Sequence, residues 1–170
     1  MQKHSKQKIN AEKEALTAKG LYPHEKWEFL ENGIFIAKSR MPRSAEQINI
    51  LEKELEQARI LVNHGSTVYL LPEADHPKIK KKKYPDAVVD GFIMEFKTVS
   101  GNERKIKGKY KEARKKADNV FLQIDSPFSQ RTVVSKLLGT IRGKGYETGL
   151  IWVYFSQSGK MAYWSVKDLK

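Results

Sequence analysis

Three residues in the middle of the chain have the types and spacing needed for chemistry on a phosphodiester. Asp86 follows a proline, and Glu95 stands two residues before Lys97. A carboxylate can exchange a proton or hold a metal ion, and a lysine can stabilise the negative charge that develops on a phosphate. The pattern therefore predicts cleavage of a nucleic-acid backbone.

Two mechanisms fit these residues. In the first, Asp86 and Glu95 hold Mg²⁺ and Lys97 orients or deprotonates the attacking water. This arrangement resembles the Pro-Asp … Glu-x-Lys pattern of restriction-like nucleases, and it implies a DNA substrate. In the second, no metal takes part and the 2′-hydroxyl of RNA is the nucleophile.

The metal-free mechanism draws on a larger set of side chains. A carboxylate or a histidine takes the proton of the 2′-hydroxyl, and a cation stabilises the phosphorane. Glu95, Lys97 and Thr98 supply one half of this set, and Arg131 and Thr132, at the start of an expected helix, supply the other.

A β-hairpin over residues 84–97 is expected to position the first three residues. Asp90-Gly91 between two short apolar runs is a strong signal for a two-residue turn. In that register Asp86 lies opposite Glu95, and the alternation of side chains puts both on one face with Lys97. The alternative interpretation is a solvated strand face with a surface ion pair.

The charge of the chain indicates a polyanionic partner. The net charge is +12, and residues 78–118 hold 14 Lys and Arg against 6 Asp and Glu, a net of +8. Nucleic acid is the favoured partner, and an acidic protein, an anionic membrane surface and solubility alone are the rivals. The expected nucleic-acid-binding residues are Lys80, Lys81, Lys82, Lys83, Arg104, Lys105 and Lys107.

The composition excludes several other classes of protein. The chain has 170 residues, 39% of them hydrophobic, which is enough for a real core. It has no cysteine, so a disulfide framework and a thiolate metal site are excluded. No apolar run approaches the roughly 20 residues of a membrane span.

The order of expected elements predicts an α+β fold, a compact antiparallel or mixed sheet packed against two to three helices. Residues 1–26 are expected to form an N-terminal helical arm and residues 27–170 a nuclease-like domain. Ser44 should cap a long helix, with Gln47 completing a capping box. The expected buried face of that helix comprises Ile48, Leu51, Leu55, Ala58 and Val62. The other expected elements are a hairpin over 27–38, strands over 67–71 and 119–124, helices over 102–117 and 129–142, and a final hairpin of 150–155 and 161–166.

From about residue 44 to the end, the chain resembles the C-terminal toxin domains of contact-dependent growth inhibition proteins. That group belongs to the barnase/EndoU/colicin/RelE-like ribonucleases, many of which cleave tRNA. The resemblance covers about three quarters of the chain. It rests on His64-Gly65, Val68-Tyr69-Leu70-Leu71-Pro72-Glu73, Pro85-Asp86-Ala87, Asp90-Gly91, Glu95-Phe96-Lys97-Thr98, Val120-Phe121-Leu122 and the terminal β-pair.

The resemblance implies a metal-independent ribonuclease toxin that cleaves tRNA and is neutralised by an acidic immunity or antitoxin protein. It implies action in the cytoplasm after delivery from another cell as part of a larger protein. The functional positions it implies are Asp86, Glu95, Lys97, Thr98, Arg131 and Thr132. A clear catalytic histidine is missing, and a phage or mobile-element protein fits equally well. A non-catalytic nucleic-acid-binding module is the alternative from another class.

Overall fold

The computed structural model describes residue 18 and residues 20–73 and 84–170. Most of the expected N-terminal arm lies outside these residues, although residues 18, 20 and 21 are helical. The described chain groups into two units by its contacts, one ending at Met94 and one spanning Glu95–Lys170. They are called here the N-terminal unit and the C-terminal unit. The expected division at residue 26 stays a prediction.

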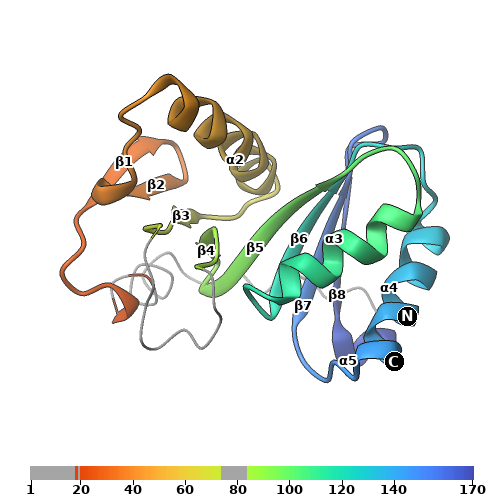
Figure 1. The fold of residues 1–170 in the computed structure, drawn as a ribbon. Coiled ribbons are helices and arrows are strands. Elements are labelled where there is room, and N and C mark those ends of the chain that lie inside the picture. Colours follow the sequence, from red (N-terminus) through yellow and green to blue (C-terminus); the bar gives the residue numbers. More distant parts are fainter. Residues whose placement is uncertain (1–17, 19, 74–83) are drawn as a thin grey trace. The chain divides into compact units, whose positions relative to one another are not determined.

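The N-terminal unit is a small mixed sheet with one long helix (Figure 1). Strands β1 (Trp27–Glu31) and β2 (Ile34–Ala37) form an antiparallel hairpin, and a 3₁₀ helix, η1 (Lys38–Arg40), follows. After α2 (Ala45–Asn63), β3 (Val68–Leu70) pairs parallel to β2. Strand β4 (Ala87–Val89) pairs antiparallel to β3 and to the first residues of β5 (Phe92–Val99).

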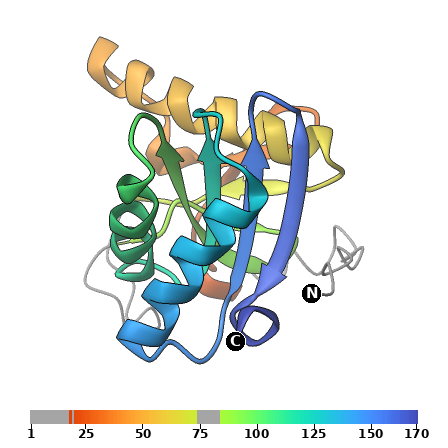
Figure 2. The same ribbon diagram turned by 90° about the vertical axis from the view of Figure 1, so that its right-hand side faces the viewer.

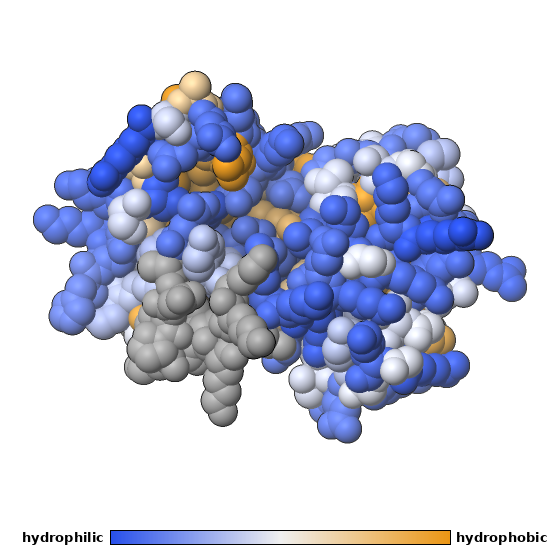
Figure 3. Space-filling model, in the orientation of Figure 1, coloured by the Kyte–Doolittle hydropathy of each residue, from blue (hydrophilic) through white to orange (hydrophobic). Residues whose placement is uncertain are grey.

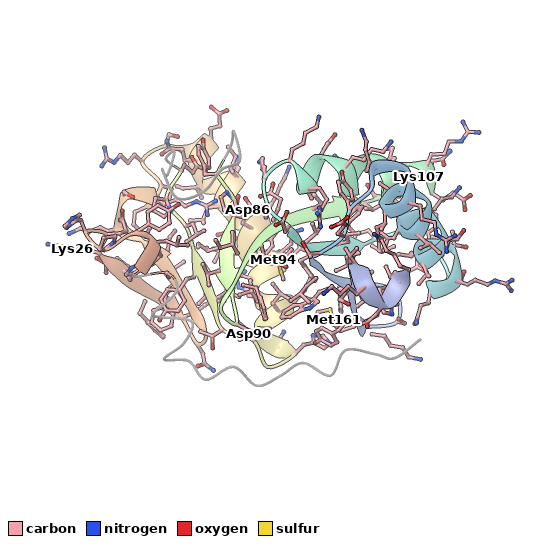
Figure 4. The ribbon with its side chains drawn as sticks, turned by 90° about the horizontal axis from the view of Figure 1, so that it is seen from below. Lys26, Asp86, Asp90, Met94, Lys107 and Met161 are labelled. Carbon is pink, nitrogen blue, oxygen red and sulfur yellow. The ribbon has the colours of Figure 1, made fainter. Side chains whose placement is uncertain are left out.

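The turn between β4 and β5 forms as the sequence predicts. Val89 pairs with Phe92, and both turn residues have positive φ, 50° at Asp90 and 86° at Gly91. The Asp90 carboxylate is buried and accepts hydrogen bonds from the Ser66 hydroxyl and a backbone N–H. Asp86 and Asp90 lie at opposite ends of β4 (Figure 4).

Helix α2 has the predicted cap but a shifted buried face. Ser44 Oγ accepts the backbone N–H of Gln47, as expected, whereas the Gln47 side chain accepts the N–H of Arg43 and not that of the cap residue. The assignment of Ile48 to the core is wrong, because its side chain is 48% exposed. The buried face begins one turn later and comprises Leu51, Leu55, Gln57, Ala58 and Leu61.

The C-terminal unit places two helices side by side on one face of its strands (Figure 2). After β5 come α3 (Arg104–Arg114), β6 (Asn119–Ile124) and α4 (Gln130–Lys144). Strand β7 (Leu150–Phe155) runs parallel to β6, and β8 (Lys160–Ser165) pairs antiparallel to β7. The last strand ends one residue earlier than predicted, because Ser165 caps a short helix, α5 (Val166–Leu169), in a capping box.

The core of this unit lies between the two helices and the strands. Its side chains come from the helix positions that the 3.6-residue rhythm predicts, Ile106, Tyr110 and Ala113 from α3 and Val133, Leu137 and Ile141 from α4. Each large apolar side chain buried in this way contributes about 1.5–3 kcal/mol. The opposite surfaces of the helices are polar, so the unit is largely hydrophilic in the view of Figure 3. With its parallel and antiparallel strand pairs and its helices, the protein has the α+β class that the sequence predicts.

A buried arginine closes one end of the C-terminal unit. Arg114 Nη1 donates hydrogen bonds to the carbonyl oxygens of Asp118, at 2.9 Å, and Thr148, at 2.6 Å. Its guanidinium lies 4.2 Å from the ring centroid of Tyr146, in cation–π contact. Gly149 is needed here, because its φ is 129° and a Cβ would stand 2.2 Å from a carbonyl oxygen.

None of the helices in the described part of the chain is both long enough and apolar enough to cross a membrane.

Candidate active site

Strand β5 carries a glutamate into the interior of the C-terminal unit. Side chains alternate along the strand, so Glu95 and Lys97 share a face with Val99, which packs in the core beneath the helices. The Glu95 side chain is 1% exposed. A buried carboxylate costs several kcal/mol unless charges and hydrogen bonds compensate it.

Two lysines compensate this charge. Lys116, in the turn after α3, places Nζ 3.0 Å from Glu95 Oε2, and Lys97 Nζ lies 3.9 Å from the same oxygen. Lys97 Nζ is also 3.6 Å from Glu112 Oε2 on α3. These four residues are called here the Glu95 cluster. The cluster extends from the buried Glu95 carboxylate to the exposed Glu112. The two lysines between them are partly exposed, Lys97 at 21% and Lys116 at 26%.

The cluster has the parts for chemistry on a phosphate. Two ammonium groups that reach solvent can contact phosphate oxygens and neutralise charge that develops on them. The carboxylate beneath them is a proton acceptor. Its two ammonium neighbours would repel a divalent cation that approached it. In the described ranges, no three His, Cys, Asp or Glu side chains are grouped so that they could hold a metal ion.

Neither Asp86 nor Thr98 is one of the four residues of the Glu95 cluster. Asp86 belongs to the N-terminal unit, where it is half-buried and its carbonyl oxygen accepts from Arg40 Nη1 at 3.2 Å. Thr98 is exposed and follows Lys97 directly, so it lies on the opposite face of β5 from the Glu95 cluster.

Arg131 and Thr132 belong to the first turn of α4. The helix is capped by Ser129, whose Oγ accepts the backbone N–H of Thr132 at 3.1 Å. The N–H of Asp125, just after β6, donates to the carbonyl of Val99, so the last residue of β5 lies beside the connection that leads to α4. Glu95 is four residues further back along β5, about 13 Å at the rise of a strand. The structure therefore does not bring the first turn of α4 to the Glu95 cluster.

The predicted nucleic-acid-binding residues divide into two groups. Arg104, Lys105 and Lys107 are exposed on α3. Lys107 reaches toward α4, with Nζ 3.5 Å from where a Cβ on Gly139 would stand (Figure 4). Lys80, Lys81, Lys82 and Lys83 lie outside the described residues.

Sequence reasoning missed Glu112 and Lys116 as members of the cluster. It extended the helix to residue 117, but α3 ends at Arg114 and Lys116 turns toward β5. A signal was present, because a glutamate in a strand that is otherwise buried needs a cation from a neighbouring element. Lys116, two residues after the end of the next helix, was an available candidate.

No family model matches the chain, and no curated protein matches it. Among solved structures, the chain is similar to one from the CdiA-CT/CdiI toxin and immunity complex from Burkholderia pseudomallei. The sequence identity is 21% and the TM-score 0.48, over 73% of this chain and 90% of that chain. A likeness of this extent does not identify a function.

Proposed function

We propose that the C-terminal unit is a nuclease that cleaves RNA, with the Glu95 cluster as its reactive centre. The observation that carries the proposal is the buried Glu95 carboxylate held 3.0 Å from Lys116 and 3.9 Å from Lys97. Buried ion pairs are often no more stabilising than apolar side chains of similar volume. Stability alone therefore gives little reason for a glutamate at this position of β5, whereas chemistry does.

In the proposed reaction, the lysines bind one phosphodiester and the glutamate takes a proton. The Glu95 carboxylate accepts the proton of the 2′-hydroxyl, the 2′-oxygen attacks the adjacent phosphorus, and the bond to the 5′-oxygen breaks as that oxygen takes a proton from water. Lys97 and Lys116 neutralise the charge on the phosphorane oxygens. Because Glu95 is buried beneath them, the long lysine side chains must rotate outward to admit the sugar, which their exposed ends permit.

The distribution of charge supports a nucleic-acid substrate. Residues 95–170 contain 16 Lys and Arg against 7 Asp and Glu, a net of +9 out of +12 for the chain. An excess of that size in a unit of this length attracts polyanions and speeds their association.

The metal-free mechanism is favoured because two ammonium groups already neutralise Glu95. The alternative is a metal-dependent nuclease acting on DNA, in which Asp86 and Glu95 hold Mg²⁺ and Lys97 orients the water. That reaction would require the metal to displace Lys116 from Glu95.

The motif resemblance extends the proposal to a biological role. It supports a toxin of the contact-dependent growth inhibition type, with tRNA as the substrate and an acidic immunity protein as the partner. Such a toxin acts in the cytoplasm of a cell into which it is delivered. The positions that the motifs add, Asp86, Thr98, Arg131 and Thr132, would then contact the substrate outside the Glu95 cluster.

The test is cleavage of total tRNA and of plasmid DNA by the purified chain, each with EDTA or with Mg²⁺. Glu95→Gln and Lys97→Ala are the test variants, and Lys167→Ala, an exposed lysine on α5, is the matched control. Cleavage of tRNA in EDTA that both test variants abolish supports the proposal. Cleavage of DNA only with Mg²⁺ supports the alternative. Tight, salt-sensitive binding without any cleavage would contradict both and identify a binding module.

A further inference from the structure

A row of cations on α3 has no part in the Glu95 cluster. Arg104, Lys107 and Lys111 on α3 and Lys115, its C-cap residue, stand at intervals of three to four residues, so they share one side of the helix. All four are exposed. Within the described ranges, none of the four side chains forms an ion pair with a carboxylate.

Helix α4 carries further exposed cations. It contains no acidic residue, and Arg131, Arg142 and Lys144 are exposed on it. The two helices lie side by side (Figure 2), and side chains reach between them at two places. Lys136 Nζ lies 3.5 Å from Glu103 Oε1, and Lys107 reaches over Gly139.

The few acidic side chains near this surface are already neutralised. Glu103 pairs with Lys136, and Glu112 lies within 4 Å of the ammonium groups of both Lys97 and Lys109. What remains exposed on the two helices is a set of unneutralised cations. It comprises Arg104, Lys105, Lys107, Lys111, Lys115, Arg131, Arg142 and Lys144, and is called here the α3–α4 surface.

We propose that the α3–α4 surface binds the sugar–phosphate backbone of double-helical RNA. The surface offers charge but no stacking platform. The large hydrophobic side chains that are exposed in the described part of the chain, Phe29, Met41, Ile48, Ile50 and Tyr84, all belong to the N-terminal unit. Binding of unpaired bases relies on exposed aromatic side chains, whereas a duplex is held through its phosphates and its shape.

The dimensions agree with this partner. From Arg104 to Lys115 the row spans 12 residues, about 16 Å along the helix axis. That length matches several successive phosphates of one strand. Lys115 directly precedes Lys116, so the row ends at the Glu95 cluster. The inference deepens the proposed function, since it assigns a paired stem of the substrate to this surface.

Binding is measured by fluorescence anisotropy with a 2′-O-methyl RNA duplex, which the proposed reaction cannot cleave. Each affinity is determined over a series of salt concentrations. The test variants are Lys111→Gln and Arg142→Gln, and the matched controls are Lys160→Gln and Lys167→Gln, exposed lysines on β8 and α5. For a duplex, each lost phosphate contact makes the negative slope of log K against log salt shallower by about 0.9. We expect that change in each test variant, with an affinity at least several-fold lower, and no change in the controls.

Equal losses in test and control variants would overturn the assignment, as would tighter binding of a single strand of the same sequence. Tighter binding of a DNA duplex would also contradict it. Failure of the proposed function looks different. If the chain binds the duplex through Lys111 and Arg142 but cleaves no RNA, the assignment of the α3–α4 surface stands and the proposed nuclease activity is wrong. If the chain cleaves RNA but both test variants bind the duplex as the wild type does, the proposed nuclease activity stands and the assignment of this surface is wrong.

Discussion

Replacing Lys116 with methionine is expected to destabilise the C-terminal unit by about 2 kcal/mol. Removing one partner of a fully buried ion pair costs about 3–5 kcal/mol, because the other charge stays buried. Two features of the structure lower that figure. Lys116 is 26% exposed, so solvent screens the pair, and Lys97 remains 3.9 Å from the same carboxylate. Lys97→Met should cost about 1 kcal/mol, since that lysine is further from Glu95 and Lys116 remains.

The assay is urea unfolding followed by tryptophan fluorescence in a Trp27→Phe background. The chain has three tryptophans, and the remaining two, Trp152 and Trp164, are buried in the C-terminal unit and report on it. Lys115→Met, at the exposed neighbouring position, is the matched control.

A double-mutant cycle isolates the electrostatic part of the effect. In a Glu95→Gln background no buried charge is left behind, so Lys116→Met should then cost less than about 1 kcal/mol. The reasoning is refuted if Lys116→Met costs no more than Lys115→Met, or if its cost is the same with Gln at position 95.

Three further predictions concern other parts of the protein. Gly149→Ala should destabilise the protein by more than about 1 kcal/mol, because a Cβ would stand 2.2 Å from a carbonyl oxygen at a φ of 129°. Gly143→Ala on α4 has open space around the added Cβ, so it should stabilise the protein by up to about 1 kcal/mol. Both changes are measured in the same unfolding assay. Burial raises the pKa of Tyr110 from 10.0 to about 12. The stability that the neutral phenol contributes is therefore complete below pH 10 and is lost as the pH rises toward 12. The free energy of unfolding should fall by up to about 1.4 kcal/mol per pH unit in that range. Tyr110→Phe should flatten that alkaline decline when unfolding is measured from pH 8 to 12. Arg59→Ala should lower the free energy of unfolding by less than about 1 kcal/mol, and only at low salt, because the ion pair that Arg59 forms with Glu31 is exposed. If the same loss of stability is measured in about 1 M salt, the ion pair is not its cause.

Local sequence signals predicted the elements of both units well. The hairpin at Asp90-Gly91 formed in the expected register because a two-residue turn with positive φ at both positions fixes the pairing. The long helix over 45–63 has its predicted cap, and the core positions of α3 and α4 follow from periodicity alone. The error at Ile48 has a tertiary cause. The first turn of α2 is exposed to solvent, and periodicity does not report where along a helix packing begins.

The candidate site was only partly predictable from the sequence. Glu95 and Lys97 were identified because they are two residues apart on one strand, and alternation puts them on one face. Lys116 was not identified, because its contact with Glu95 depends on where α3 ends, and helix ends are the least certain feature of a sequence-based assignment. Thr98 was grouped with its neighbours although alternation alone places it on the other face of β5.

The most direct test of the central claim is the chemical identity of the ends produced when the chain cleaves RNA. Attack by the 2′-oxygen, with Glu95 as proton acceptor and the two lysines on the phosphorane, leaves a 2′,3′-cyclic phosphate and a 5′-hydroxyl. The account predicts these ends in EDTA, from tRNA incubated with the wild-type chain, and their loss in Lys116→Ala and Glu95→Gln but not in Lys167→Ala. A 3′-hydroxyl and a 5′-phosphate that appear only with Mg²⁺ would contradict it, because they require a metal-activated water in place of the 2′-hydroxyl.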